Sequence, residues 1–177
     1  MNKSFGTVVF SHGKDSSPKS HKIERLEPLV RQCGWDVRVV DDSDTNDPVV
    51  RRDRLVELLR SIRAPVVLWG SSLGGVISVF AAKQVQVEGL FLLAPAVYWP
   101  GYEDRDHRVS VPFIEVVHGW ADDIVPFELS QRFAQEHRAS LHLLDDDHLL
   151  HVQLDQVGHL LRHFLKRVAQ STQSAVA

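Results

Sequence analysis

The feature that most constrains the fold of this chain is a regular alternation between short apolar runs and longer stretches with helical periodicity. The apolar runs lie at residues 5–11, 35–40, 65–70, 89–94, 111–118 and 141–144. Several runs are nearly continuous in Val, Ile, Leu and Phe, as is typical of strands that helices cover on both faces. Strands that alternate with helices in this way form βαβ units, so the sequence predicts a parallel sheet of about six strands.

The stretches between these runs are predicted to be helices, at residues 19–32, 48–62, 73–83, 127–137 and 149–169. In the first of them, Ile23, Leu26 and Val30 share one apolar stripe. Asp47 is a good N-cap for the second helix. The expected fold class is therefore α/β, a three-layer α/β/α sandwich with helices on both faces of the sheet.

The length and composition fit one domain. A chain of 177 residues, of which 44% are apolar, can fill one core and is short for two domains. We expect residues 1–170 to form this domain and the small, polar residues 171–177 to be a flexible tail.

Charge and cysteine content narrow the expected partners and compartment. The net charge of -3 gives no basic field to hold a polyanion, so nucleic acid is not an expected partner. The single cysteine, Cys33, cannot form an intramolecular disulfide or a thiolate zinc site, which fits the reducing cytosol. The first ten residues lack the apolar core of a signal peptide, and no run reaches the roughly 18 apolar residues of a membrane span. We expect a cytoplasmic protein without a membrane partner, and its oligomeric state stays open.

Two groups of residues have the side chains of metal ligands without the spacing. They are Asp41, Asp42, Asp44 and Asp47 in one loop, and His159 and His163 in the last predicted helix. The acidic loop matches no calcium-binding pattern, and the histidine pair has no third ligand at a recognisable spacing. We interpret both groups as solvated surface, and we expect no metal and no cofactor.

Glu115 interrupts the apolar run at residues 111–118. A buried carboxylate needs a partner, because moving a charge out of water is costly. The sequence does not indicate which residue is that partner.

The most specific motif is Gly70-x-Ser72-x-Gly74, which lies between a predicted strand and a predicted helix. In that context a Gly-x-Ser-x-Gly sequence forms a sharp turn that exposes its serine at the tip. The two glycines remove side chains that would clash in such a turn. The N-terminus of the following helix favours negative charge, so the backbone N–H of Leu73 is a candidate oxyanion donor for an attack by Ser72.

A serine hydroxyl needs a base within hydrogen-bonding distance and a carboxylate that orients the base. Both are expected in loops at the carboxyl ends of later strands. The fifth predicted strand is followed by Asp122 and Asp123, and the sixth by His148 and His151. The resulting order of Ser, Asp and His along the chain is that of the α/β-hydrolase triad.

With these residues the sequence resembles a small, lidless member of the α/β-hydrolase superfamily, close to the short bacterial esterase-like serine hydrolases. The resemblance covers nearly the whole chain. It rests on four segments, which are Ser11-His12-Gly13, the turn at residues 70–74, the pattern H-G-x-x-D-x-x-V-P at residues 118–126, and D-H-L-L at residues 147–150.

The resemblance implies that Ser72 is the nucleophile, Asp122 the orienting acid and His148 the general base. Asp123 remains a rival for the acid, because a shift of one residue separates it from Asp122. His151 remains a rival for the base, although His148 is the histidine that directly follows an aspartate at the strand exit.

The resemblance also implies that the residue after His12 and Gly13 provides the second oxyanion donor. In this sequence that donor is the backbone N–H of Lys14, beside the N–H of Leu73. The charge of the Lys14 side chain would then be unimportant. His12 itself is interpreted as a structural histidine that bonds the loop backbone.

These positions together predict acyl transfer by way of an acyl-enzyme. The stretch that follows residue 94 is too short for a cap domain, so we expect an open site, with Tyr98, Trp99 and Trp120 as candidate pocket residues. The expected substrate is a small carboxylic ester or thioester. The alternative is a hydrolase-fold protein that mainly binds a protein or ligand, with weak turnover or none.

Overall fold

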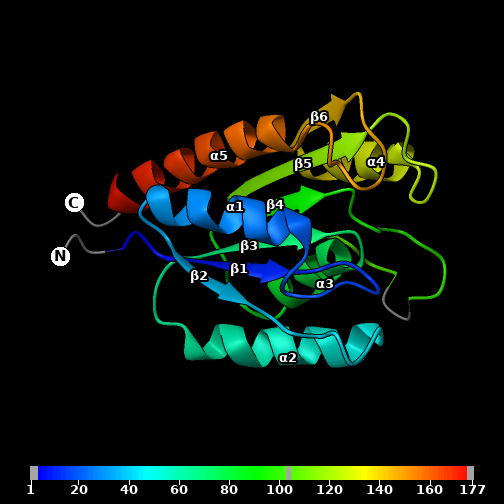
Figure 1. Cartoon of the computed structure of the whole chain (residues 1–177). Helices are drawn as coiled ribbons and strands as arrows, with labels where there is room; N and C mark the ends of the chain where they lie inside the picture. Colours follow the sequence, from blue (N-terminus) through cyan, green and yellow to red (C-terminus); the bar gives the residue numbers. More distant parts are fainter. Residues whose placement is uncertain (1–3, 103–104, 175–177) are drawn as a thin grey trace.

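The apolar runs of the sequence form the strands of one sheet in the computed structural model, which describes residues 4–102 and 105–174 (Figure 1). The strands are β1 (Thr7–Ser11), β2 (Asp36–Val39), β3 (Val66–Ser71), β4 (Gly89–Leu93), β5 (Phe113–Gly119) and β6 (Ser140–Leu144). The helices are α1 (His21–Gln32), α2 (Pro48–Ser61), α3 (Leu73–Ala82), α4 (Phe127–His137) and α5 (Leu154–Ser174).

The sheet of the described residues has six strands in the order β2-β1-β3-β4-β5-β6, and every neighbouring pair is parallel. In the centre of the sheet Trp69 of β3 pairs with Phe10 on one side and with Phe91 on the other. Parallel strands carry their carboxyl ends to one edge, so the loops after β1, β3, β5 and β6 lie at the same end of the molecule (Figure 1). The predicted parallel sheet of about six strands is confirmed.

Each face of the sheet carries its own apolar core, because successive side chains of a strand point to opposite faces. On one face, α2, α3 and α4 pack against strand residues such as Leu68 and Leu92. On the other face, α1 and α5 cover residues such as Trp69 and Phe91 (Figure 1). Burial on both faces explains why the runs are continuously apolar, and the α/β/α sandwich is confirmed.

The last helix begins later than its periodicity predicts. The prediction started at residue 149, whereas α5 starts at Leu154. Leu150 has a φ of 54°, which interrupts a right-handed helix. The carboxylate of Asp146 accepts a hydrogen bond of 2.7 Å from the backbone N–H of Gln153, and this satisfies a donor where the helix begins.

The end of α5 also differs from the prediction. Residues 171–174, predicted as part of the flexible tail 171–177, continue the helix to Ser174. The hydroxyl of Thr172 donates to the backbone carbonyls of Val168 and Ala169, which anchors this turn. The remaining residues of the predicted tail, 175–177, lie outside the described residues.

The partner of Glu115 is supplied by tertiary structure. This carboxylate is 2% exposed, and it contacts the imidazole of His142 on β6 at 3.0 Å and the guanidinium of Arg167 on α5 at 3.6 Å. Both partners are partly exposed, so they connect the buried charge to the surface.

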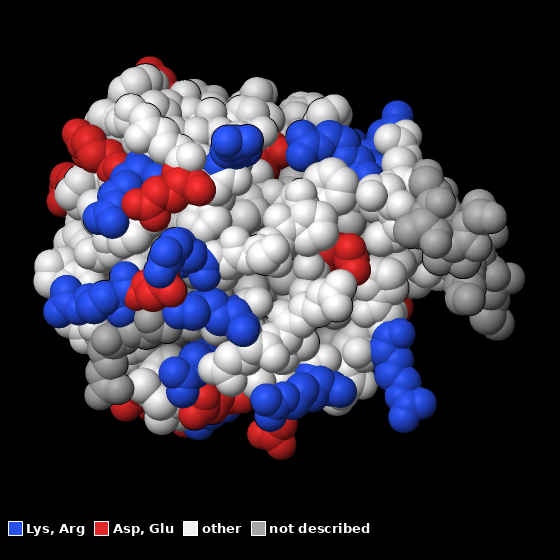
Figure 2. Space-filling model, turned by 180° about the vertical axis from the view of Figure 1, so that it is seen from behind, with Lys and Arg blue, Asp and Glu red and all other residues white. Residues whose placement is uncertain are grey.

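Charged side chains of both signs are interspersed on the face shown in Figure 2. At the surface, Arg54 and Asp44 form an ion pair of 2.6 Å. Within residues 4–102 and 105–174, no helix combines the length and the apolar character that a membrane span requires.

Candidate active site

The motif Gly70-x-Ser72-x-Gly74 forms the turn between β3 and α3. Ser72 has φ 53° and ψ -117°, a strained backbone conformation for a residue with a side chain. A Cβ atom at Gly70 would lie 2.5 Å from the carbonyl oxygen of Gly74, and one at Gly74 would overlap the backbone of Ser11. A side chain at either glycine would therefore displace backbone atoms, and Ser72 lies at the tip of the turn, where it is partly exposed.

The loops after β3, β5 and β6 bring three of the predicted residues into one hydrogen-bonded chain. Ser72 Oγ lies 3.0 Å from His148 Nε2, and His148 Nδ1 lies 2.7 Å from Asp122 Oδ2. Because a carboxylate only accepts, Nδ1 carries the imidazole proton and Nε2 accepts from the serine hydroxyl. The side chain of His148 is 10% exposed and that of Asp122 is fully buried. We call these three residues the Ser–His–Asp cluster.

The two rival residues lie outside this cluster. The carboxylate of Asp123 is on an exposed residue and forms no hydrogen bond with any residue that the structure describes. His151 is also exposed, and its ring packs edge-on against the ring of His21 with centroids 5.1 Å apart. The structure therefore brings Asp122 and His148 to Ser72, and neither rival forms a hydrogen bond with these residues.

Asp122 accepts hydrogen bonds at both oxygens. Oδ1 accepts from the backbone N–H groups of Ile124 at 2.9 Å and Val125 at 2.8 Å. Oδ2 accepts from His118 at 2.8 Å as well as from His148. Burial raises the pKa of Asp122, but the hydrogen bonds from the two imidazoles and the two amides outweigh it and hold this pKa well below its usual range. The carboxylate is thus fixed in its charged form.

His118, at the end of β5, was matched as part of a motif but was given no role from the sequence. Its side chain is fully buried, so it does not reach solvent. Its Nε2 lies 2.8 Å from Asp122 Oδ2 and 2.9 Å from the carbonyl oxygen of Val125, and its Nδ1 lies 2.8 Å from the hydroxyl of Ser130 on α4. The signal that could have identified it is the H-x-x-x-D spacing, which turns both side chains toward the same loop.

The two predicted oxyanion donors belong to segments that adjoin Ser72. Leu73 is the first residue of α3, where backbone N–H groups point out of the helix. A Cβ atom on Gly13 would lie 3.5 Å from the Cβ of Ser72, so the loop that carries Lys14 packs against the serine. Neither the N–H of Leu73 nor that of Lys14 donates a hydrogen bond to another of the described residues. Both N–H groups are thus without a hydrogen-bond partner among the described residues.

A buried network holds the loop after β1. His12 Nδ1 donates to the carbonyl oxygen of Gly13 at 2.9 Å, and its Nε2 accepts from the backbone N–H of Asp42 at 3.1 Å. These bonds confirm the structural interpretation of His12, and burial lowers its pKa. The guanidinium of Arg51, which is fully buried, donates to the carbonyl of His12 and forms a 3.3 Å ion pair with Asp42.

The acidic loop is more structured than predicted. Asp42 was expected to be solvated, but it is 2% exposed, because Arg51 and Arg54 neutralise it. Asp47 accepts from the backbone N–H groups at the start of α2, so its predicted role as N-cap is confirmed.

The three aromatic candidates for a pocket have different surroundings. The hydroxyl of Tyr98 donates to Glu136 on α4 at 2.5 Å, so this side chain is directed to that helix. Trp99 is 37% exposed and Trp120 is 55% exposed. The Trp120 ring packs edge-on against Phe127, with centroids 5.0 Å apart. The tryptophans are thus accessible, whereas the tyrosine hydroxyl is engaged.

Lys22, in the first turn of α1, was missed by the sequence reasoning. It is partly buried, and burial lowers its pKa to about 8. The carboxylates of Asp147, Asp122 and Asp146 favour its charged form, but they do not offset burial. Its neighbours come from distant loops, which explains why no sequence pattern reveals them.

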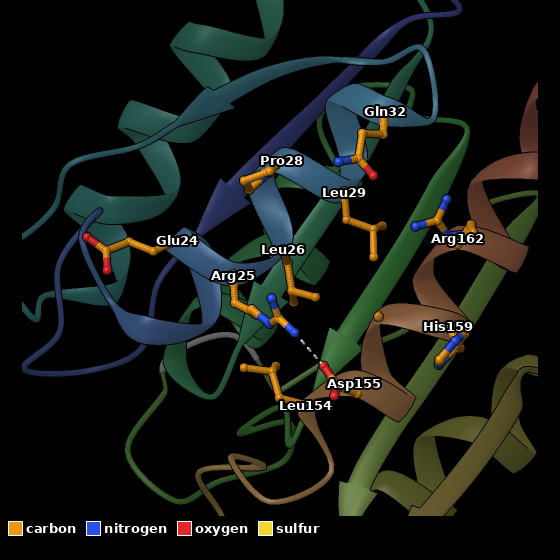
Figure 3. Close-up of a pocket in the computed structure, with 11 residues that line it drawn as sticks. Glu24, Arg25, Leu26, Pro28, Leu29, Gln32, Leu154, Asp155, His159 and Arg162 are labelled. Atoms are coloured by element: carbon orange, nitrogen blue, oxygen red, sulfur yellow. Dashed lines mark hydrogen bonds and ion pairs between the residues drawn. The ribbon is translucent and has the colours of Figure 1, made fainter.

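A groove of about 370 Å³ lies between α1 and α5, and Figure 3 shows its lining. The guanidinium of Arg25 and the carboxylate of Asp155 pair across it at 2.9 Å. Leu26 and Leu154 contribute apolar surface. No member of the Ser–His–Asp cluster lines this groove, so it is separate from the candidate active site.

The fold and the cluster define the class of protein. A parallel sheet whose strand-to-helix turn presents a serine to a histidine and an aspartate from later loops is the architecture of the α/β-hydrolase superfamily. Among solved structures, a candidate hydrolase of the alpha/beta superfamily from Xanthomonas campestris pv. campestris is 29% identical, with a TM-score of 0.86 over 93% of this chain and 99% of that one.

Two further structures share the fold at lower identity. A serine hydrolase without lid, also from Xanthomonas campestris, is 22% identical, with a TM-score of 0.78 over 94% of this chain and 84% of that one. Est1E from Butyrivibrio proteoclasticus, solved with ferulic acid bound, is 15% identical, with a TM-score of 0.78 over 94% of this chain and 90% of that one. Over its described residues the chain accordingly has the α/β-hydrolase fold without a lid, as the sequence resemblance implied.

The family is shown by a match to residues 7–109, which are more than half of the chain. The protein belongs to the uncharacterised protein family UPF0227. No curated protein matches it significantly in sequence.

Proposed function

We propose that this protein is a serine hydrolase that cleaves small carboxylic esters or thioesters through an acyl-enzyme. The observation that carries the proposal is the continuous hydrogen-bonded chain from Ser72 Oγ through His148 to Asp122, with distances of 3.0 Å and 2.7 Å. A hydroxyl is a weak nucleophile at neutral pH, and this arrangement is the one that activates it.

In the proposed mechanism, Ser72 Oγ attacks the substrate carbonyl while His148 Nε2 takes the hydroxyl proton. Asp122 stabilises the imidazolium that forms, and the N–H groups of Leu73 and Lys14 bind the oxyanion. Collapse of the tetrahedral intermediate expels the alcohol or thiol, which receives the proton from the imidazolium. Water then attacks the acyl-enzyme by the same route, and the carboxylic acid is released.

The small-ester substrate class is supported by two exposed aromatic side chains in the loops that follow β4 and β5. The accessible Trp99 and Trp120 offer flat apolar surface, which suits short acyl or aromatic groups. Ferulic acid, the ligand in the Est1E structure, is a carboxylic acid and so has the chemistry of an acyl product.

The first test is labelling with a fluorophosphonate probe, with the labelled site identified by intact mass and peptide mapping. Stoichiometric labelling at Ser72 that disappears in Ser72→Ala and in His148→Ala supports an activated serine. Folded wild-type protein that is not labelled would refute the proposal and favour a binding module.

Paired variants distinguish the cluster from its rivals. Asp122→Asn should lower the hydrolysis of a chromogenic short-chain ester by about 10⁴-fold, because the imidazole is then held in the wrong tautomer. Asp123→Asn, at the exposed neighbouring position, should leave hydrolysis unchanged. The reverse result would assign the acid to Asp123.

A further inference from the structure

His118 has an environment unlike that of a residue that only fills space. It is fully buried, it lies outside the Ser–His–Asp cluster, and both of its ring nitrogens are hydrogen-bonded. A buried polar group costs free energy unless its bonds are satisfied, so the fold provides three partners for one imidazole. One of these partners is the same Asp122 oxygen that accepts from His148.

The partners of His118 determine where its proton lies. Nε2 faces two acceptors, the carboxylate of Asp122 and the carbonyl oxygen of Val125, so Nε2 carries a proton. Nδ1 faces the hydroxyl of Ser130. Among the described residues, that hydroxyl has no hydrogen-bond partner other than Nδ1. The hydroxyl can donate its proton to Nδ1, which satisfies both groups and leaves the imidazole neutral.

We propose that His118 is a positioning residue of the active site: Ser130 fixes its neutral Nε2–H tautomer, and this N–H holds the Asp122 carboxylate in the orientation that His148 uses. The inference rests on the proposed function and deepens it. It extends the three-residue cluster to a chain of five side chains that runs from α4 to the nucleophile.

A donated hydrogen bond also sets how strongly the carboxylate attracts a positive imidazolium. With the N–H of His118 in place, part of the negative charge on Asp122 is stabilised by a neutral donor. Without it, Asp122 attracts a positive imidazolium at His148 more strongly, so the pH dependence of the reaction should change. The other charged groups that interact across this region are Lys22 from α1 and the carboxylates of Asp146 and Asp147, and all three are unchanged by a substitution at His118.

The experiment measures kcat/KM against pH for a short-chain chromogenic ester, with His118→Leu and His118→Gln. His118→Leu removes the donor and should lower kcat/KM by about 10- to 100-fold, the usual effect of losing a group that orients a ligating or catalytic side chain. It should also move the acid limb of the profile, which is the range in which kcat/KM falls as the pH is lowered, to higher pH. His118→Gln can place an amide N–H near the position of Nε2. This variant should restore both the activity and the wild-type position of the acid limb.

The matched control is His142→Leu. His142 lies on the neighbouring strand β6 and is bonded to another buried carboxylate, that of Glu115, at 3.0 Å. Its removal should leave the acid limb where the wild type has it. A folded His118→Leu protein whose pH profile keeps the wild-type acid limb would overturn the inference, whatever its activity.

A second measurement does not depend on turnover. Ring ¹⁵N NMR of histidine-labelled protein should show His118 as the neutral Nε2–H tautomer near neutral pH, and Ser130→Ala should perturb its Nδ1 resonance. An Nδ1–H or doubly protonated ring would overturn the inference even if His118→Leu does not fold. A wild type that neither labels at Ser72 nor hydrolyses the ester refutes the proposed function, whereas an active wild type with an unmoved limb in His118→Leu refutes this inference alone.

Discussion

Gly74→Ala tests the link between the serine turn and the loop that carries Lys14. An added Cβ would overlap the carbonyl group of Ser11, whose carbon would be 2.5 Å away, and it would lie 2.6 Å from the carbonyl oxygen of His12. Carbon contacts normally lie at about 3.5 Å, so the backbone of that loop must retreat by at least about 1 Å. Both neighbours are backbone atoms, and the movement cannot be absorbed by a flexible side chain.

The expected effect on stability is modest. Overpacking of this kind costs about 1–3 kcal/mol, and replacing a helical glycine by alanine returns about 0.5–1 kcal/mol. Native domains are stable by about 5–15 kcal/mol, so the variant should fold. The effect on activity should be larger, because a misplaced oxyanion donor costs about 10²- to 10³-fold in turnover.

The assay combines urea denaturation with kcat/KM for a short-chain ester. Gly158→Ala is the control, since its Cβ would meet the end of the Leu29 side chain at 3.1 Å, beside the groove between α1 and α5. That variant should keep full activity. A Gly74→Ala protein as active and as stable as the wild type would refute the reasoning, because the loop would then not depend on this close approach.

Three further predictions follow from the buried charges. Arg51→Met leaves the buried carboxylate of Asp42 without its main partner and should cost about 3–5 kcal/mol; in denaturant titrations Arg31→Ala, at a surface pair with Glu27, should cost less than about 1 kcal/mol. The pKa of Asp122 is lower in the folded protein than the value of about 3.9 in the unfolded chain, so Asp122 stabilises the fold above that pH and this stability is lost as the pH falls. The unfolding free energy of Asp122→Asn should therefore fall less steeply than that of the wild type below pH 4. Equal slopes for the two proteins would contradict the assignment. The pKa of Lys22 is lowered to about 8 in the folded protein, so between about pH 8 and 10.4 the unfolded chain holds a proton on Lys22 that the folded protein has lost. The stability of the wild type should therefore rise with pH across that range. Lys22→Met should lack this rise, and a rise of the same size in that variant would show that another group causes it.

The strands and the serine turn could be predicted because local sequence determines them. Runs buried on both faces are apolar throughout, and Gly70 is required by a contact within the turn, that with the carbonyl oxygen of Gly74. The beginning of α5 could not be predicted in this way. Leu149 and Leu150 continue the helical periodicity, yet Asp146 binds the amide of Gln153 and the helix starts beyond it.

The members of the Ser–His–Asp cluster could be predicted from their order along the chain and from the family resemblance. The residues that hydrogen-bond to buried groups behind the cluster and in the sheet could not. His118 and Ser130 are linked through a helix that packs against β5, and Glu115 reaches His142 through strand pairing. Such contacts depend on register and on the packing of layers, which a single sequence does not specify. Asp42 was interpreted as solvated for the same reason, since Arg51 reaches it from α2.

The placement of the three cluster residues has a mechanical consequence. Ser72 follows β3, which has a neighbour on each side, whereas His148 follows β6, which pairs with β5 alone and is only partly buried. The edge of a sheet opens more readily than its centre. Brief fraying of β6 would separate the base from the nucleophile while the rest of the sheet stays intact. An inhibitor that bonds to Ser72 and also contacts His148 would link the centre of the sheet to its edge. The backbone amides that it protects most against hydrogen exchange should be those of β6.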